Sequence, residues 1–326
     1  MGQSAPIFVV GMNGSGTGAL TRSLAQHSQL YAFPGESRVF LTYMGRFPAP
    51  PNLSDTQYLG VLEDVSKDPG LTRWNGHQPL PILDNPMGPR TVAGALDRAF
   101  LYFAEQEGVT RWCEKTPMNA RCIESLVAHF PDAKIVHVIR DGRDAALSFQ
   151  RRFGFSPTLS VFRWKKLVRE AARQGATVGE ACYFELHYED LTTSPADVLR
   201  SVCEFLDLEF EDGMLSPVRP TNAPMLAGTF VANSGKWREL ATPAQIETME
   251  NIAGRTLQGL GYGATNADGD QNLPAWRVFL YEVGDGLRSA QRYASRVFSG
   301  SGSLAHRLRV LSGIAVSSLR ARLRRR

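Results

Sequence analysis

The segment Gly11–Gly18 (GMNGSGTG) has the composition of a loop that could hold an anion. It follows the apolar run Ile7–Val10 and leads into a helical pattern. Glycines let the backbone approach an anion closely, and the free N–H groups at a helix start attract negative charge. Ser15 and Thr17 add hydroxyl donors. The segment therefore predicts a phosphate-binding loop, and an ordinary tight turn is the open alternative.

The glycine spacing nearly matches the loop of nucleotide kinases, G-x-x-x-x-G-K-[ST]. Thr17 stands where that loop has its lysine, which reaches the β- and γ-phosphates. A dinucleotide loop, G-x-G-x-x-G, does not fit either, because Gly16 is followed two residues later by Gly18. The loop indicates binding of a phosphate without ATP phosphoryl chemistry.

Three further segments place charged residues directly after candidate strands. Arg140 follows the strand KIVHVI, and Ser148 lies about two helical turns further on. A guanidinium at a strand end is a good phosphate ligand. Lys115 follows a short strand in WCEKTP, and Glu36 follows another in PGESR. Two alternatives stay open, a structural pair of Arg140 with Asp144 and a surface pair of Glu36 with Arg38.

Alternating strands and helices are needed to bring these segments together. The predicted strands are Ile7–Val10, Leu30–Phe33, Arg111–Cys113, Lys134–Ile139 and Ala181–His187. The predicted helices are Thr17–His27, Val92–Glu107, Asn119–His129, Asp141–Arg152, Leu159–Arg173 and Pro195–Leu206, with loops and short helices over 45–90. This order predicts an α/β fold, a P-loop-like parallel sheet covered by helices on both faces. Because ligands bind at the carboxyl ends of such strands, the four segments would share one cleft.

At these residues the chain resembles the sulfotransferases that use 3′-phosphoadenosine 5′-phosphosulfate (PAPS), in a bacterial-like form nearest the tyrosylprotein and carbohydrate branch. The resemblance covers roughly residues 6–262. It implies that Glu36 is the catalytic base and that Lys115 stabilises the transferring group. The implied contacts with PAPS are Asn13, Gly14, Ser15, Gly16, Thr17 and Gly18 in the 5′-phosphosulfate loop, Arg140 and Ser148 in the 3′-phosphate motif, Tyr188 in YEDL, and Ser234, Lys236 and Trp237 in SGKWREL.

The reaction implied is in-line attack of an acceptor hydroxyl on the PAPS sulfur, with PAPS as co-substrate and no metal. One position departs from the family, because Gly14 stands where an arginine or lysine normally precedes Ser-Gly-Thr. This departure and the basic tail leave a non-catalytic, membrane-associated nucleotide-binding protein open. A P-loop-type small-molecule kinase is the second alternative, and the missing loop lysine at Thr17 argues against it. The class of the hydroxyl acceptor is not readable, and aromatic residues such as Phe40 and Trp74 fit either the acceptor side or a lid core.

The remaining composition sets limits on cofactor and location. The four cysteines are Cys113, Cys122, Cys182 and Cys203, and none forms a CxxC pair, so buried free thiols are expected instead of a metal site. The first residues do not form a secretory signal, and no apolar run is long enough to span a bilayer. We expect a cytoplasmic transferase.

The C-terminal part differs from the body in charge. We expect a sulfotransferase domain at 1–263, a polar linker at 264–274 and a basic helical extension at 275–326. After Asp285 there are ten arginines and no lysine or acid, whereas the preceding body has 26 basic and 32 acidic residues. A helical stripe in this extension consists of Leu304, Leu308, Leu311, Ala315, Leu319 and Leu323. It predicts peripheral attachment to an anionic inner membrane surface, with packing on the body or on a second subunit as the alternative. Nucleic acid is not expected as a partner, because aromatic residues do not alternate with the arginines.

Overall fold

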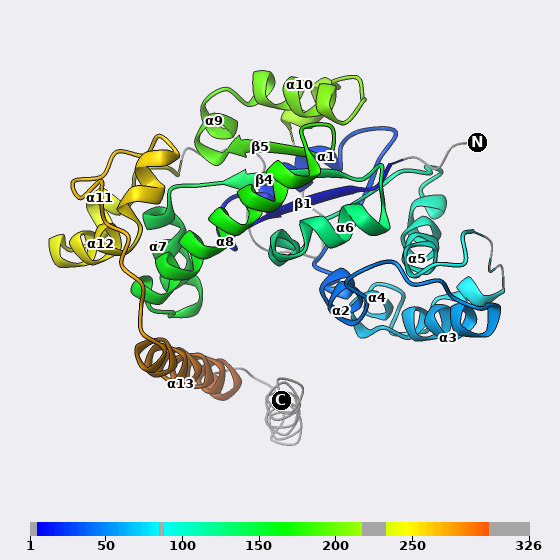
Figure 1. Ribbon diagram of the computed structural model, residues 1–326, viewed down its shortest axis with the longest axis horizontal. Coiled ribbons are helices and arrows are strands. Elements are labelled where there is room, and N and C mark those ends of the chain that lie inside the picture. Colours follow the sequence, from blue (N-terminus) through cyan, green and yellow to red (C-terminus); the bar gives the residue numbers. More distant parts are fainter. Residues whose placement is uncertain (1–4, 85, 87, 217–232, 300–326) are drawn as a thin grey trace.

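A five-stranded parallel sheet forms the centre of the protein in the computed structural model (Figure 1). The structure describes residues 5–84, 86, 88–216 and 233–299. The strands are β1 (Ile7–Gly11), β2 (Tyr31–Ala32), β3 (Trp112–Glu114), β4 (Lys134–Ile139) and β5 (Tyr183–His187). Their order across the sheet is β2-β3-β1-β4-β5, and each neighbouring pair is parallel. The predicted α/β class is confirmed.

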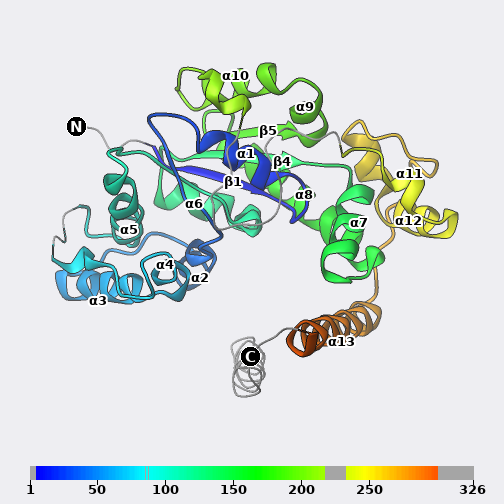
Figure 2. The same cartoon turned by 180° about the vertical axis from the view of Figure 1, so that it is seen from behind.

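Helices cover both faces of this sheet (Figures 1 and 2). The α-helices before β4 are α1 (Thr17–Leu24), α2 (Val39–Arg46), α3 (Asp55–Ser66), α4 (Pro69–Thr72), α5 (Val92–Gln106) and α6 (Ile123–His129). Those after it are α7 (Gly142–Phe153), α8 (Pro157–Val178), α9 (Tyr188–Thr193), α10 (Pro195–Phe205), α11 (Trp237–Leu240), α12 (Pro243–Gly259) and α13 (Ala275–Ser299). Short 3-10 turns cover Pro81–Leu83, Pro117–Arg121 and Asp212–Leu215.

The alternation of side chains along β1 divides the core into two layers. Phe8 and Val10 point into the larger cluster, which includes residues of α2, α3, α5, α6, α8 and α12. Ile7 and Val9 point into the smaller cluster, with Leu20 of α1 and further residues of α10. Because successive residues of a strand face opposite sides of the sheet, one buried apolar strand can serve both layers.

Element bounds agree with the sequence analysis where a strong pattern exists. β4 has the predicted residues, and each of the other four predicted strands overlaps a strand of the structure. The 17-residue helix α12 was not predicted, and α3 is a longer helix, with 12 residues, than expected within 45–90. Ser54 and Thr242 each form a capping box with a glutamine at the start of these two helices, a short signal that the sequence analysis overlooked.

The segment 264–274 lies against the body through several hydrogen bonds. Glu250 of α12 accepts hydrogen bonds from the backbone of Thr265 and Asn266, at 2.8 and 3.1 Å. Lys165, which is buried on α8, donates to Asp270 at 3.0 Å. The next helix is α13, beside α7 at the margin of the molecule (Figures 1 and 2). The proposed domain limits stay a prediction, and the leucine stripe at 304–323 lies outside the described residues.

Candidate active site

The glycine-rich loop connects the end of β1 to the start of α1. Gly14 and Gly16 have φ values of +92° and +99°, conformations that favour glycine. Gly16 also lies against the ring of Tyr188, because a Cβ built on it would come within 2.1 Å of that ring. Thr17 is the first residue of α1, and both Ser15 and Thr17 are buried. The loop therefore presents a helix start whose backbone conformation depends on glycine.

Arg140, at the end of β4, connects this loop to the segment before α11. Its guanidinium donates to the carbonyl of Gly14 at 2.9 Å and to the carbonyl of Asn233. It lies over the ring of Tyr188, 4.7 Å from the centroid. The pair with Asp144 that the sequence left open is present, at 4.0 Å. Arg140 is 4% exposed, so much of its donor capacity is already used by the protein.

Asp144 holds the start of α11 close to α7. Its carboxylate accepts the backbone N–H of Gly235 at 2.6 Å and that of Trp237 at 2.9 Å. Burial raises the pKa of this carboxyl, while Arg140 and the two N–H donors counteract part of that rise. These bonds bring Trp237 and the neighbouring Ser234 and Lys236 next to the 140–148 segment. Trp237 is buried, whereas Ser234 and Lys236 are exposed.

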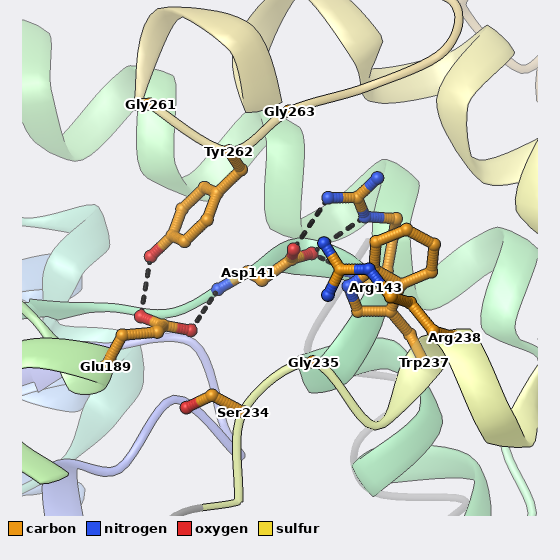
Figure 3. Close-up of a pocket in the computed structure, with 10 residues that line it drawn as sticks. All are labelled: Asp141, Arg143, Glu189, Ser234, Gly235, Trp237, Arg238, Gly261, Tyr262 and Gly263. Atoms are coloured by element: carbon orange, nitrogen blue, oxygen red, sulfur yellow. Dashed lines mark hydrogen bonds and ion pairs between the residues drawn. The ribbon is translucent and has the colours of Figure 1, made fainter. Parts of the chain in front are cut away.

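A pocket of about 330 Å³ opens between these segments (Figure 3). Its lining residues are Asp141, Arg143, Glu189, Ser234, Gly235, Trp237, Arg238, Gly261, Tyr262 and Gly263. Arg143 is held by Asp141 and Glu250, each at 2.7 Å, and stacks on the indole of Trp237 at 3.7 Å. Glu189 accepts from the hydroxyl of Tyr262 at 2.8 Å and from the backbone of Asp141 at 3.2 Å. The pocket combines a flat aromatic wall with fixed charges of both signs.

Glu36 and Lys115 are in contact at the same carboxyl edge of the sheet, after β2 and β3. Lys115 Nζ lies 3.2 Å from Glu36 Oε1, and the side chains are 16% and 29% exposed. Arg38, itself 74% exposed, lies 3.5 Å from the second carboxylate oxygen, so the surface pair left open by the sequence also exists. Since β3 lies next to β1, Lys115 follows the strand that neighbours the glycine-rich loop. A carboxylate and an ammonium group therefore lie in contact, one to two strands away from the strand that leads into the glycine-rich loop.

A buried carboxylate behind this pair holds the Glu36 loop in place. Glu114 Oε1 accepts the backbone N–H of Ser37 at 3.1 Å and its hydroxyl at 2.8 Å. The same oxygen accepts from Thr116 at 2.6 Å, and Oε2 accepts from Asn119 at 2.9 Å. Burial raises the pKa of Glu114, and the bonds from Thr116 and Ser37 lower it in part. Glu114 thus ties the residue after Glu36 to the residues around Lys115.

Three buried donors near the loop and Arg140 have no hydrogen-bond partner among the described residues. They are Ser15 Oγ, Arg140 Nε and Trp237 Nε1. Buried donors without acceptors cost free energy, so such groups indicate a missing acceptor. Ser148 adds a second hydroxyl near the loop, since its Oγ would lie 3.5 Å from a Cβ built on Gly14. Ser15, Arg140 and Ser148 lie around Gly14, so an anionic ligand that accepts from several donors fits this part of the site.

The family comparison agrees with this arrangement. A profile of the sulfotransferase family matches residues 6–212, which is more than half of the chain. The chain is a member of the sulfotransferase family. The matched segment holds the glycine-rich loop, Glu36, Lys115, Arg140 and Ser148.

Relatives at the sequence level match only part of their own length. An uncharacterized protein of Aquifex aeolicus is 27% identical over 253 residues, 72% of this chain and 30% of the relative. Protein-tyrosine sulfotransferase A of Caenorhabditis elegans is 32% identical over 114 residues, 32% of this chain and 30% of that protein. The chain thus spans under a third of the length of these relatives.

Solved structures support the fold. The sulfotransferase domain of the olefin synthase of Synechococcus PCC 7002 has a TM-score of 0.53 at 22% identity, over 76% of this chain and 94% of that domain. The sulfotransferase domain of the curacin biosynthetic pathway has a TM-score of 0.54 at 19% identity, over 80% and 98%. At such identities the likeness concerns the sulfotransferase fold alone.

Sequence reasoning named most residues that converge at the edge of this sulfotransferase sheet, and it overlooked their supports. Glu36 and Lys115 are in contact, and the loop, Arg140, Tyr188 and Trp237 form one connected group. The overlooked supports are Glu114, Asp141, Arg143, Glu189, Glu250 and Tyr262. A buried acid has no distinctive sequence signal, because its partners, such as Ser37 for Glu114, lie far away in the chain. Among the described residues, no three His, Cys, Asp or Glu side chains cluster as a metal site would require.

Proposed function

We propose that this protein transfers a sulfuryl group from PAPS to an acceptor hydroxyl by in-line displacement. The acceptor oxygen forms a bond to sulfur while the bond between sulfur and the bridging phosphate oxygen breaks. Glu36 takes the hydroxyl proton, a general-base role. The products are a sulfate ester and adenosine 3′,5′-bisphosphate, and Glu36 releases the proton to solvent.

The observation that carries this proposal is the Glu36–Lys115 contact of 3.2 Å at the strand edge beside the glycine-rich loop. A carboxylate that removes a proton and a lysine that stabilises developing negative charge must act on neighbouring atoms. Lys115 would turn from Glu36 to the sulfuryl oxygens when the donor binds. The N–H groups at the start of α1 would stabilise the leaving phosphate.

Donor recognition is assigned to the β1 and β4 side of the edge. Ser15, Arg140 and Trp237 supply the buried donors without partners described above. Arg140 and Ser148 would bind the 3′-phosphate, and Asn13 to Gly18 would surround the 5′-phosphosulfate. The pocket lined by Glu189 and Tyr262 is of a size to take part of the adenosine.

The acceptor is proposed only as a hydroxyl compound. Trp74 is the aromatic residue that we propose for the acceptor side. Its indole lies beside the Glu36 loop, since a Cβ built on Gly35 would be 2.4 Å from it. Phe40 and Tyr43 are buried in the core, so lining the acceptor site would require them to move.

A cytoplasmic location at the inner membrane surface is part of the proposal. No described helix is long and apolar enough to cross a membrane.

The experiment is transfer of ³⁵S from labelled PAPS to hydroxyl compounds in fractionated cell extract. We expect label in an acceptor fraction and release of adenosine 3′,5′-bisphosphate in equal amount. Tight binding of that product with no labelled acceptor would instead favour the non-catalytic nucleotide-binding protein. Transfer of ³²P from ATP, dependent on magnesium, would contradict the proposal in favour of a kinase.

A further inference from the structure

Helix α13 presents large apolar side chains to solvent along one face. Its exposed residues of this kind are Trp276 (64%), Phe279 (62%), Leu280 (59%), Val283 (42%) and Leu287 (62%). We call these five residues the α13 apolar stripe. They recur at intervals of three and four residues, so they share one side of the helix.

The opposite side of α13 is attached to the body mainly by polar contacts. Asp285 is buried and accepts the backbone N–H of Ser156, the residue that caps α8, at 2.9 Å. Arg288 donates to the carbonyl of Gly154 at 2.8 Å and pairs with Asp285 at 2.5 Å. Glu282 pairs with Arg163 of α8 at 2.6 Å. The docked face is thus largely polar and the free face apolar.

This orientation is the reverse of that expected for a surface helix in a soluble protein. Such a helix normally buries its apolar stripe and exposes its charges. Val278 and Tyr281 are the apolar α13 residues that the structure packs, half-buried, against the main core. A contiguous exposed apolar surface marks an interaction site. The stripe is therefore an interaction surface.

Charge decides between the possible partners. The two acids Glu282 and Asp285 are engaged by Arg163, Ser156 and Arg288, as described above. After Asp285 the chain has ten arginines and no acid. A second copy would bring a second set of seven arginines at 300–326 close to the first. The same segment folded back would meet a stripe beside which the described part of α13 offers no unengaged acid. An anionic lipid surface attracts these arginines instead.

We propose that the α13 apolar stripe docks on an anionic membrane, with α13 lying in the plane of the interface. Tryptophan and phenylalanine suit the boundary between head groups and acyl chains, and the seven arginines of the following sequence 300–326 add attraction to anionic head groups. The inference does not depend on the sulfuryl donor. It places the protein at the lipid surface through a described helix, whereas the sequence predicted attachment through the segment 304–323.

The first test is flotation of the full chain with vesicles of phosphatidylglycerol and phosphatidylcholine, compared with pure phosphatidylcholine. We expect flotation with the anionic vesicles and less of it at high salt. The double variant Phe279→Ser/Leu280→Ser should bind at least about tenfold more weakly, because two side chains no longer enter the interface. The matched control is Leu59→Ser/Leu240→Ser, which changes two leucines that are 42% and 48% exposed elsewhere, and it should bind as the wild type does. Circular dichroism melting checks that both variants fold.

The second test locates the helix in the bilayer. Brominated lipids should quench part of the tryptophan fluorescence of the bound wild type, and Trp276→Phe should remove that part while still floating. Flotation that the stripe variant leaves unchanged would overturn the proposal, because the basic segment would then suffice. Concentration-dependent dimerisation in sedimentation, lost in the stripe variant and without flotation, would also overturn it in favour of a second copy.

Discussion

Two charged pairs lie at the carboxyl edge of the same sheet, and their surroundings differ. Glu36 and Lys115 are 3.2 Å apart and partly exposed. Arg140 and Asp144 are 4.0 Å apart, with side chains that are 5% and 2% exposed. An exposed pair is worth about 0–1 kcal/mol, whereas removing one partner of a buried pair costs about 3–5 kcal/mol. The first pair can therefore separate at little cost, and the second maintains the local structure between the glycine-rich loop and α11.

The backbone contacts show the same contrast. Arg140 and Asp144 bind carbonyl and N–H groups of Gly14, Asn233, Gly235 and Trp237, so they hold the loop and α11 together. Glu36 and Lys115 bind each other, and their loops are fixed from behind by Glu114. This comparison predicts that variants on the β2–β3 side change turnover, while variants on the β1–β4 side change binding and stability.

The largest expected effect is that of Glu36→Gln. If Glu36 is the base, turnover should fall by roughly 10²–10⁴-fold, while affinity for adenosine 3′,5′-bisphosphate stays nearly constant. The measurement is kcat with labelled PAPS together with calorimetric titration of the nucleotide. Arg38→Gln is the matched control, because it removes the other partner of Glu36 and should change kcat little. Wild-type turnover in Glu36→Gln would contradict the assignment.

The variant Arg140→Ala tests whether Arg140 binds a phosphate or only holds the loop and the segment before α11 together. As a ligand, Arg140 contributes to binding PAPS and not to adenosine 5′-phosphosulfate, which lacks the 3′-phosphate. The loss should be about 1.5–3 kcal/mol for PAPS alone, the scale of a charged hydrogen bond. Equal weakening of both nucleotides, accompanied by a lower melting temperature, would mean that the bonds to Gly14 and Asn233 are its whole role.

The fold was predictable because its strongest signals are local. β4 is rich in β-branched residues, with His137 between two apolar pairs, and Gly14 and Gly16 of the first loop occur where φ is positive. Because parallel strands end at one edge, the shared edge of Glu36 and Lys115 followed from the predicted parallel sheet. Their direct contact depends on β2 lying next to β3, an order that was not predicted. Family motifs added the roles, which remain predictions.

The supports of the site could not be predicted because they depend on contacts between distant residues. Arg143 reaches Glu250 across 107 positions, and Asp144 reaches Trp237 across 93. The orientation of α13 is opposite to what its pattern predicts, since an amphipathic helix normally packs its apolar face on the core. The buried Asp285 and the bonds of Arg288 and Glu282 show that the polar face is inside.

Glu114 provides a test of how the β2–β3 side is built. Glu114→Ala leaves the donors of Ser37, Thr116 and Asn119 without their acceptor, and each such loss costs about 1–3 kcal/mol. Glu114→Gln should be far milder, because Asn119 Oδ1 has no partner among the described residues and could accept from the new amide after a flip. Melting temperature and kcat are the measurements. An alanine variant as stable and active as the wild type would show that the Glu36 loop needs no support.

The smallest effect is expected at Gly14, where the family normally has a basic residue. Gly14 has φ +92°, so any other residue there is strained by about 1–3 kcal/mol. The strain comes from the backbone, because a Cβ would meet Ser148 Oγ and the Ala145 carbonyl at ordinary contact distances of 3.5 Å.

Gly14→Ala therefore reports the strain alone, and Gly14→Arg adds the charge on the side facing Ser148. We expect both variants to melt a few degrees lower than the wild type. If the missing charge limits the chemistry, kcat of Gly14→Arg should exceed that of Gly14→Ala at an unchanged KM for the acceptor. Equal kcat values in the two variants would mean that Lys115 already supplies the positive charge, and that the glycine is a compatible variation of the family loop.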